Sequence, residues 1–152
     1  MTQTAFETIE LVNIQMVRER TVFYNGNRVT APHQAAEAFI SIVGNPDREY
    51  FLAFMVDGKN RITSVSVISQ GSLNQSVVHP RETFKAAVLA NAASVIVAHN
   101  HPSGDLVPSR EDIEITRRLK EAGDILGIKV LDHVIVNTDT RESASFVQQG
   151  LM

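Results

Sequence analysis

The chain contains no cysteine and no tryptophan among its 152 residues, and only 6% of it is aromatic. The absence of cysteine excludes disulfide bonds, thiolate metal ligands and cysteine nucleophiles. Any metal site in this chain must therefore use nitrogen and oxygen atoms, which means histidine and carboxylate side chains.

Positive charge is also scarce: 14 Lys and Arg stand against 17 Asp and Glu, a net charge of -3. Proteins that bind phosphate backbones normally present a basic face, so direct binding of nucleic acid is not expected. No apolar run is long enough to span a bilayer, so no membrane contact is expected either. Residues 1–15 carry acidic side chains where an export signal needs a basic segment, which favours a cytoplasmic location.

The rest of the composition is that of an ordinary globular protein, with 43% hydrophobic and 20% charged residues. A chain of this length fits one structural unit with a sizeable core. Within that unit we expect an N-terminal appendage of strand and helix over residues 1–45 and a main domain over residues 46–152.

In the appendage, alternating apolar and β-branched residues predict a strand over residues 9–23, and Asn25-Gly26 predicts a turn. A helix is predicted over residues 32–43, with Thr30 as its cap.

The main domain alternates between strand and helix patterns. Strands are predicted over residues 49–56, 61–68, 94–98 and 128–136, and helices over residues 80–92, 109–126 and 143–149. This order predicts an α/β (α+β) fold, a mixed β-sheet with helices packed on it. Ligands of such folds bind beyond the strand ends, which is where the loop after Ala98 lies.

The side chains best suited to chemistry are His99 and His101, which flank one residue at a strand end, so that both imidazoles point the same way. Catalytic zinc takes three protein ligands and keeps one position for water. Without cysteine the third ligand must be a carboxylate, and Asp112 is the natural candidate. It lies three residues after Ser109 in the first turn of a helix, and turn residues over 102–108 can bring that helix back over the strand end.

Each part of this pattern has another explanation. A histidine pair at alternate strand positions is more often exposed or hydrogen-bonded, and Ser109 with Asp112 equally forms a helix capping box. Asp105 is a second carboxylate in the same loop, although its position after Gly104 suits a turn better. The metal site is favoured because all the features occur together at this spacing.

Three strings carry a family resemblance: HPRETF, NAASVIVAHNHPSGDLVPSREDI and LGIKVLDHVIV. Over residues 45–136 the chain resembles the RadC-like branch of the JAMM, or MPN-plus, zinc peptidases. The resemblance implies a three-layer JAMM/MPN architecture, similar to that of cytidine deaminases. It also implies one Zn2+ ion per chain with one bound water, held by His99, His101 and Asp112, and cleavage of a peptide or isopeptide bond in a peptide or protein substrate.

The same resemblance assigns catalytic roles to Glu49 and Ser109. Glu49 matches the glutamate that takes a proton from the attacking water and passes it to the leaving amine. Ser109 would donate a hydrogen bond to the developing oxyanion. Glu82 in HPRETF is the rival of Glu49, although an acidic residue there also suits the first turn of a helix.

Three further histidines lie outside this set. His79 and His133 fall within the family strings but lack metal-ligand spacing, so they stay unassigned, with a structural role favoured for each. His33 is expected at the surface.

The competing function is a non-catalytic or regulatory metal-binding module associated with DNA repair or DNA metabolism, whose apolar strand over residues 9–23 recruits a partner. Scaffold versions of the fold usually lose metal ligands, whereas all are present here. Longer family members also carry a helix-hairpin-helix region that residues 1–45 are too short to supply, which weakens a DNA role. The sequence leaves open the substrate, the choice of zinc over iron or manganese, and the assembly state, a homodimer included.

Overall fold

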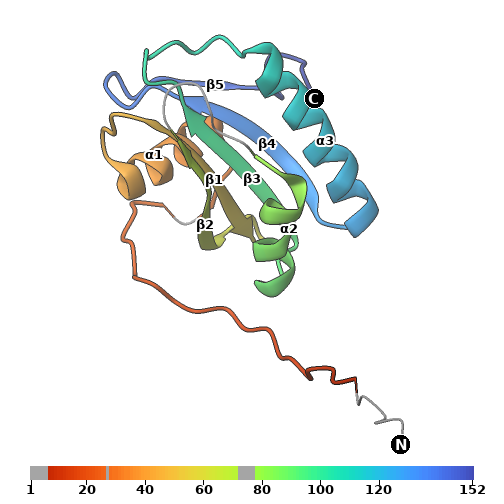
Figure 1. Cartoon of the computed structure of the whole chain (residues 1–152). Helices are drawn as coiled ribbons and strands as arrows, with labels where there is room; N and C mark the ends of the chain where they lie inside the picture. Colours follow the sequence, from red (N-terminus) through yellow and green to blue (C-terminus); the bar gives the residue numbers. More distant parts are fainter. Residues whose placement is uncertain (1–6, 27, 72–77) are drawn as a thin grey trace, which may run out of the picture.

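The computed structural model describes residues 7–26, 28–71 and 78–152. The elements, in chain order, are α1 (Pro32–Val43), β1 (Glu49–Val56), β2 (Ile62–Gly71), α2 (Pro80–Leu89), β3 (Ser94–Asn100), α3 (Arg110–Leu126), β4 (Lys129–Val136) and β5 (Ser143–Ser145). Figure 1 shows them arranged around one sheet.

The five strands of the described part form a single mixed sheet in the order β2-β1-β3-β4-β5. β1 is antiparallel to both β2 and β3, and β5 is antiparallel to β4. β3 and β4 are parallel because α3 carries the chain back across the sheet between them. The predicted mixed sheet with packed helices is confirmed.

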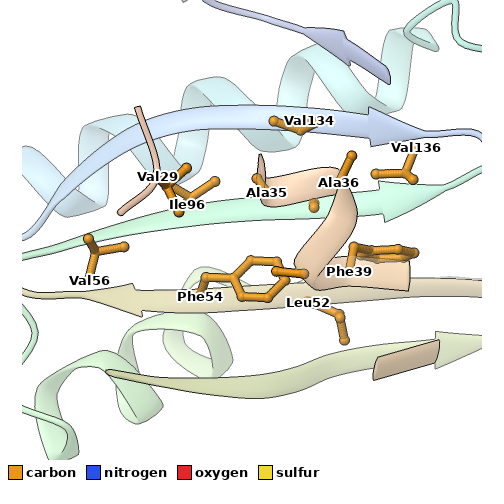
Figure 2. Packing of buried hydrophobic residues seen from close by; sticks show 12 residues of the cluster. Val29, Ala35, Ala36, Phe39, Leu52, Phe54, Val56, Ile96, Val134 and Val136 are labelled. Carbon is orange, nitrogen blue, oxygen red and sulfur yellow. The ribbon is translucent and has the colours of Figure 1, made fainter. Parts of the chain in front are cut away.

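Helices cover both faces of this sheet (Figure 1), because successive side chains of a buried strand point to opposite faces. Leu52 and Phe54 of β1 pack with Phe39 of α1 in one apolar cluster (Figure 2), while Phe51 and Ala53 pack in a second cluster with residues of α2 and α3. The architecture therefore has three layers, as the family resemblance implies.

The helix predicted over residues 32–43 is α1, but Thr30 does not cap it. The cap position is Ala31, which has no side-chain hydroxyl to offer. Oε1 of Gln34 takes over this task and accepts hydrogen bonds from the backbone N–H groups of Thr30 (2.6 Å) and Ala31 (3.0 Å). Gln34 can do so because the third residue of a helix reaches back to the cap.

The strand predicted over residues 9–23 is wrong. The segment is extended but pairs with no described strand, and Figure 1 shows residues 7–20 leading away from the sheet. Ile9 is 97% and Leu11 102% exposed, so the apolar side chains of this alternating pattern do not pack against the domain. The boundary at residue 45 stays a prediction, although α1 packs into the core of the sheet.

Two predictions in the main domain also need correction. The helix predicted over residues 80–92 ends at Leu89, and Asn91 then takes a left-handed conformation with φ 51°. The helix predicted over residues 143–149 is the short strand β5 followed by turns, because Ser143–Ser145 pairs with the outer edge of β4 and Phe146 is fully buried. No helix among the described residues is long and apolar enough to cross a membrane.

Candidate metal centre

The candidate site lies where the C-terminal end of β3 meets the first turn of α3. In the pairing of β1 with β3, Phe51 stands opposite His99. Continuing this antiparallel register by two residues brings Glu49 beside His101, on the same face of the sheet. Asp112 is the third residue of α3 and approaches this face from the helix.

The polar atoms of these residues converge. Nε2 of His99 lies 2.9 Å from Nε2 of His101 and 3.2 Å from Oδ1 of Asp112. Nε2 of His101 lies 3.0 Å from Oδ2 of Asp112. One ligand atom from each of these residues and from Glu49 lies within 4.8 Å of the others, so this group could hold a metal ion.

Ser109 and Asp112 form the capping box that the sequence left as an alternative. Oγ of Ser109 accepts a hydrogen bond from the backbone N–H of Asp112 (3.0 Å), and the Ser109 N–H donates to Oδ2 of Asp112 (2.8 Å). The cap and the candidate site are compatible, because the cap holds the Asp112 carboxylate in position beside the two imidazoles.

The loop after β3 determines which nitrogen of His101 faces the centre. Nδ1 of His101 donates to the backbone carbonyl of Asp105 (2.7 Å), since a carbonyl only accepts. Nε2 is therefore the nitrogen with the available lone pair. The Asp105 carboxylate accepts from the N–H of Val107 (2.9 Å), as a turn residue does, and lies outside the group of candidate ligands.

Asn100, between the two histidines, is tied to the backbone around Glu49, a contact that the sequence did not indicate. It is buried, its Oδ1 accepts from the N–H of Tyr50 (2.8 Å), and its Nδ2 donates to the carbonyl of Arg48 (3.0 Å). These two bonds hold the backbone on both sides of Glu49. Only a side chain with both a donor and an acceptor can make them.

His133 is the second residue that the sequence left unassigned near the site. In the parallel pairing of β3 with β4 it stands beside Val97, which shares a face with His99. Its Nε2 lies 2.7 Å from Nδ1 of His99, and it is fully buried. The signal that could have found it is the strand pair VIVAHN and KVLDHVIV, but the register of a parallel pair depends on the helix between the strands.

The surroundings favour an ionised carboxylate and one positive charge in the centre. Burial opposes ionisation of Asp112, but the hydrogen bond from His101 holds the pKa of its carboxyl well below the usual range. The hydrogen bond to Asp112 in turn raises the pKa of His101. Burial raises the pKa of Glu49, although the nearby His99 opposes this shift.

A metal ion suits this donor set. Two imidazole nitrogens and a carboxylate approach one another at 2.9 to 3.2 Å. Their lone pairs repel at such distances unless a proton or a cation lies between them. Nitrogen and oxygen ligands in this number match zinc that keeps a position for water.

The other acidic residue and histidines that the sequence analysis considered lie outside this site. Glu82 is exposed in the first turn of α2, where it pairs with Lys85 at 2.8 Å. His79 is the cap of α2, and its Nδ1 accepts from the N–H of Arg81 (3.2 Å), so its role is structural. His33 is exposed, as expected.

A cavity of about 400 Å³ adjoins the candidate centre, since Glu49 and Asp112 both line it. Its remaining lining residues are Phe51, Val78, Arg110, Glu111, Glu114, Ile115 and Arg118. The cavity thus offers apolar walls and charged side chains of both signs next to the converging donors.

Fold and site together define a JAB-type domain. The model of the RadC-like JAB domain matches residues 29–151, and the chain belongs to this family. It is 52% identical over 144 residues to a UPF0758 protein of Geotalea uraniireducens (strain Rf4). This match covers 95% of the chain and 61% of the relative.

Other relatives show a similar degree of likeness. The UPF0758 protein GSU0386 of Geobacter sulfurreducens is 55% identical over 125 residues, or 82% of this chain and 54% of the relative. The UPF0758 protein SH1266 of Staphylococcus haemolyticus is 45% identical over 123 residues, or 81% of this chain and 53% of the relative. The chain therefore spans between about half and three fifths of the length of these relatives.

Proposed function

We propose that the chain is a zinc-dependent hydrolase that cleaves an amide bond, peptide or isopeptide, in a peptide or protein substrate. The observation that supports the proposal is the convergence of two imidazoles, the Asp112 carboxylate and Glu49 within 4.8 Å, beside a cavity of about 400 Å³. Membership of the RadC-like JAB domain family also supports the proposal.

His99 and His101 would hold the ion through their Nε2 atoms and Asp112 through its carboxylate. A bound zinc ion would supply Lewis acidity and make water available as a nucleophile near neutral pH. Glu49 would accept a proton from the attacking water at its carboxylate and deliver it to the leaving nitrogen. Its raised pKa suits this task, because a carboxyl that holds its proton closer to neutral pH is a better donor.

Ser109 would stabilise the oxyanion. Its Oγ accepts from the N–H of Asp112, and this bond leaves the hydroxyl hydrogen available to donate. A hydrogen bond of this kind is typically worth a factor of about 100 or more in turnover.

The test combines metal analysis with cleavage of a peptide library derived from a bacterial proteome. Wild-type protein should contain close to one zinc per chain, and His99→Ala and Asp112→Ala should lose it. Glu49→Gln should keep the zinc and lose cleavage, because the amide cannot carry the proton. Glu82→Gln is the matched control, and it should cleave as the wild type does, since Glu82 is exposed on α2 and lies outside the group.

A metal-binding module without catalysis is the second candidate, and the exposed apolar residues between Ile9 and Val17 favour it because such segments recruit partners. The same variants separate the two functions. Cleavage in the wild type that Glu49→Gln abolishes supports the hydrolase. Zinc binding with no cleavage of any library peptide supports the module, and retention of zinc by both His99→Ala and Asp112→Ala rejects both proposals.

A further inference from the structure

A buried chain of hydrogen bonds starts at the Nδ1 atom of His99, the nitrogen that does not face the candidate metal position. Nδ1 of His99 lies 2.7 Å from Nε2 of His133, and Nδ1 of His133 lies 2.6 Å from Oγ1 of Thr116. Oγ1 of Thr116 then donates to the backbone carbonyl of Asp112 at 2.6 Å. The exposed fraction of His99, His133 and Thr116 is at most 1%, so these hydrogen bonds are shielded from water.

The direction of every bond in the chain follows from its last member. A carbonyl oxygen can only accept, so the single hydroxyl hydrogen of Thr116 is committed to Asp112. Nδ1 of His133 must therefore donate to Thr116. A neutral imidazole that donates through Nδ1 accepts through Nε2, so Nδ1 of His99 must donate to His133. The lone pair of His99 is thereby left on Nε2, which faces His101 and Asp112.

Aromatic packing holds the rings of His99 and His133 in the planes that these hydrogen bonds require. His133 stacks on Phe146 with ring centroids 4.4 Å apart, and His99 stacks on Phe51 at 5.8 Å. A flipped ring or the other tautomer would leave a polar atom without a partner in a region that water does not reach. Such an orphaned group is strongly disfavoured in a protein interior.

We propose that Thr116 and His133 are positioning residues for the metal centre, which fix His99 in the one tautomer whose Nε2 can bind a metal ion. The proposal rests on the metal role proposed above for His99. It gives a role to a fully buried histidine and a helix threonine that lie outside the group of candidate ligands. Partners of this kind behind ligating histidines typically change metal affinity 10- to 100-fold.

The test compares Thr116→Val with Thr116→Ser in the full chain, by competition titration of zinc against a chromophoric chelator. Valine keeps the shape of threonine but removes the hydroxyl, so His133 loses the acceptor that sets its tautomer. We expect zinc affinity to fall about 10-fold or more in Thr116→Val and to stay within about 2-fold of the wild type in Thr116→Ser, which keeps the hydroxyl.

Thr83→Val is the matched control. Thr83 is also a buried helix threonine, but its Oγ1 has no hydrogen-bond partner in the described part of the chain. Its replacement should leave zinc affinity unchanged. Thermal melts of all variants confirm that the comparison is made between folded proteins.

Nitrogen-15 NMR of the zinc-loaded wild type gives a second measurement that needs no substrate. The His133 ring should carry its proton on Nδ1 and none on Nε2. A proton on Nε2, wild-type zinc affinity in folded Thr116→Val, or equal loss in the serine and valine variants would each overturn the proposal. If the wild type itself binds no zinc, the proposed function fails together with it, whereas zinc binding without a serine-valine difference removes the positioning role alone.

Discussion

At the scale of single residues, the centre depends on how its polar atoms share a few protons. Nδ1 of His101 is committed to the Asp105 carbonyl, so only its Nε2 faces Asp112. In the metal-free protein one proton between His101 and Asp112 can supply the positive charge that these donors need. A metal ion and this proton therefore compete for one position, which makes metal binding depend on pH.

The first prediction concerns the free energy of unfolding of the metal-free protein. The pKa of Asp112 lies below its ordinary value of 3.8, so this group stabilises the fold above that pH and ceases to do so as the pH falls through its folded pKa. The pKa of His101 lies above 6.5, so its contribution is complete below that pH and is lost as the pH rises through its folded pKa. The loss of stability caused by Asp112→Asn should therefore be largest between about pH 3.8 and 6.5.

Urea denaturation of chelator-treated wild type and Asp112→Asn across pH 3 to 9 (roughly the range that brackets the ordinary pKa values of Asp and His) measures this difference. Taking the difference between the two proteins matters, because burial lowers the pKa of His133 and its protonation opposes folding in acid in both of them. A difference that keeps growing from pH 6.5 to 9 would contradict the predicted pairing of the two groups.

At the scale of elements, local sequence signals predicted some elements to the residue. α1 and β1 begin and end where Pro32, the glycine after Val43 and the apolar run EYFLAFMV indicate. These elements carry their own signals, a helix start and stop or a doubly buried strand. β5 does not, because Ser143–Ser145 becomes a strand only through the outer edge of β4, which no local pattern specifies.

The site followed the same rule. The convergence of His99, His101 and Asp112 was predictable because one loop connects them, and the cap at Ser109 orients the helix start. Their role as metal ligands stays a prediction. The contacts of Asn100 and His133 were missed because their partners lie on other strands. Asn100 bonds to the backbone of Tyr50 in β1 and of Arg48 just before β1. His133 lies beside β3 only through the register of the parallel pair.

The second prediction concerns the loop that holds His101. Gly104 has a φ of 78°, and an added Cβ would lie 3.0 Å from Nδ2 of Asn137, which donates to the Gly104 carbonyl at 3.0 Å. Gly104→Ala should lower the free energy of unfolding by about 1–2 kcal/mol, because a left-handed conformation is unfavourable for alanine. Zinc affinity should fall as well, since the N–H of Gly104 also bonds to the carbonyl of His101.

Gly58→Ala is the control for this prediction. Gly58 lies in the β1-β2 turn, does not have a left-handed φ, and would have no atom within 4 Å of an added Cβ. The substitution should be neutral or slightly stabilising in chemical denaturation. Equal stability of the Gly104 and Gly58 variants would show that the loop tolerates a side chain where the structure gives it no room.

At the scale of the whole molecule, the candidate site lies on one face of the sheet, opposite the apolar cluster that packs against α1. The face under α1 carries a buried apolar cluster, part of which Figure 2 shows. The opposite face, beneath α2 and α3, carries His99 and His133 next to an apolar cluster that includes Phe51 and Val97. Close packing on the first face gives rigid support to the polar network on the second, because protein interiors have low compressibility.

The last prediction concerns the extended segment, residues 7–20, which lies outside both layers. Its apolar side chains are exposed: Ile9 97%, Leu11 102% and Ile14 70%. An exposed row of apolar side chains of this kind usually contacts another protein chain, and a homodimer formed through it stays a prediction. The triple variant Ile9→Ser, Leu11→Ser and Ile14→Ser should abolish any concentration-dependent association seen by sedimentation equilibrium. Its melting temperature should stay that of the wild type, because these side chains are not buried against the domain.

Ile125→Ser is the control for that experiment, since Ile125 is 87% exposed on α3 and is not part of the segment. It should leave both association and melting temperature unchanged. If the wild type is monomeric at all concentrations, the homodimer prediction is wrong and the segment serves a different partner or none. If the triple variant melts well below the wild type, the segment instead packs on its own domain in solution. That result would also explain why its strand-like pattern is present although no described strand pairs with it.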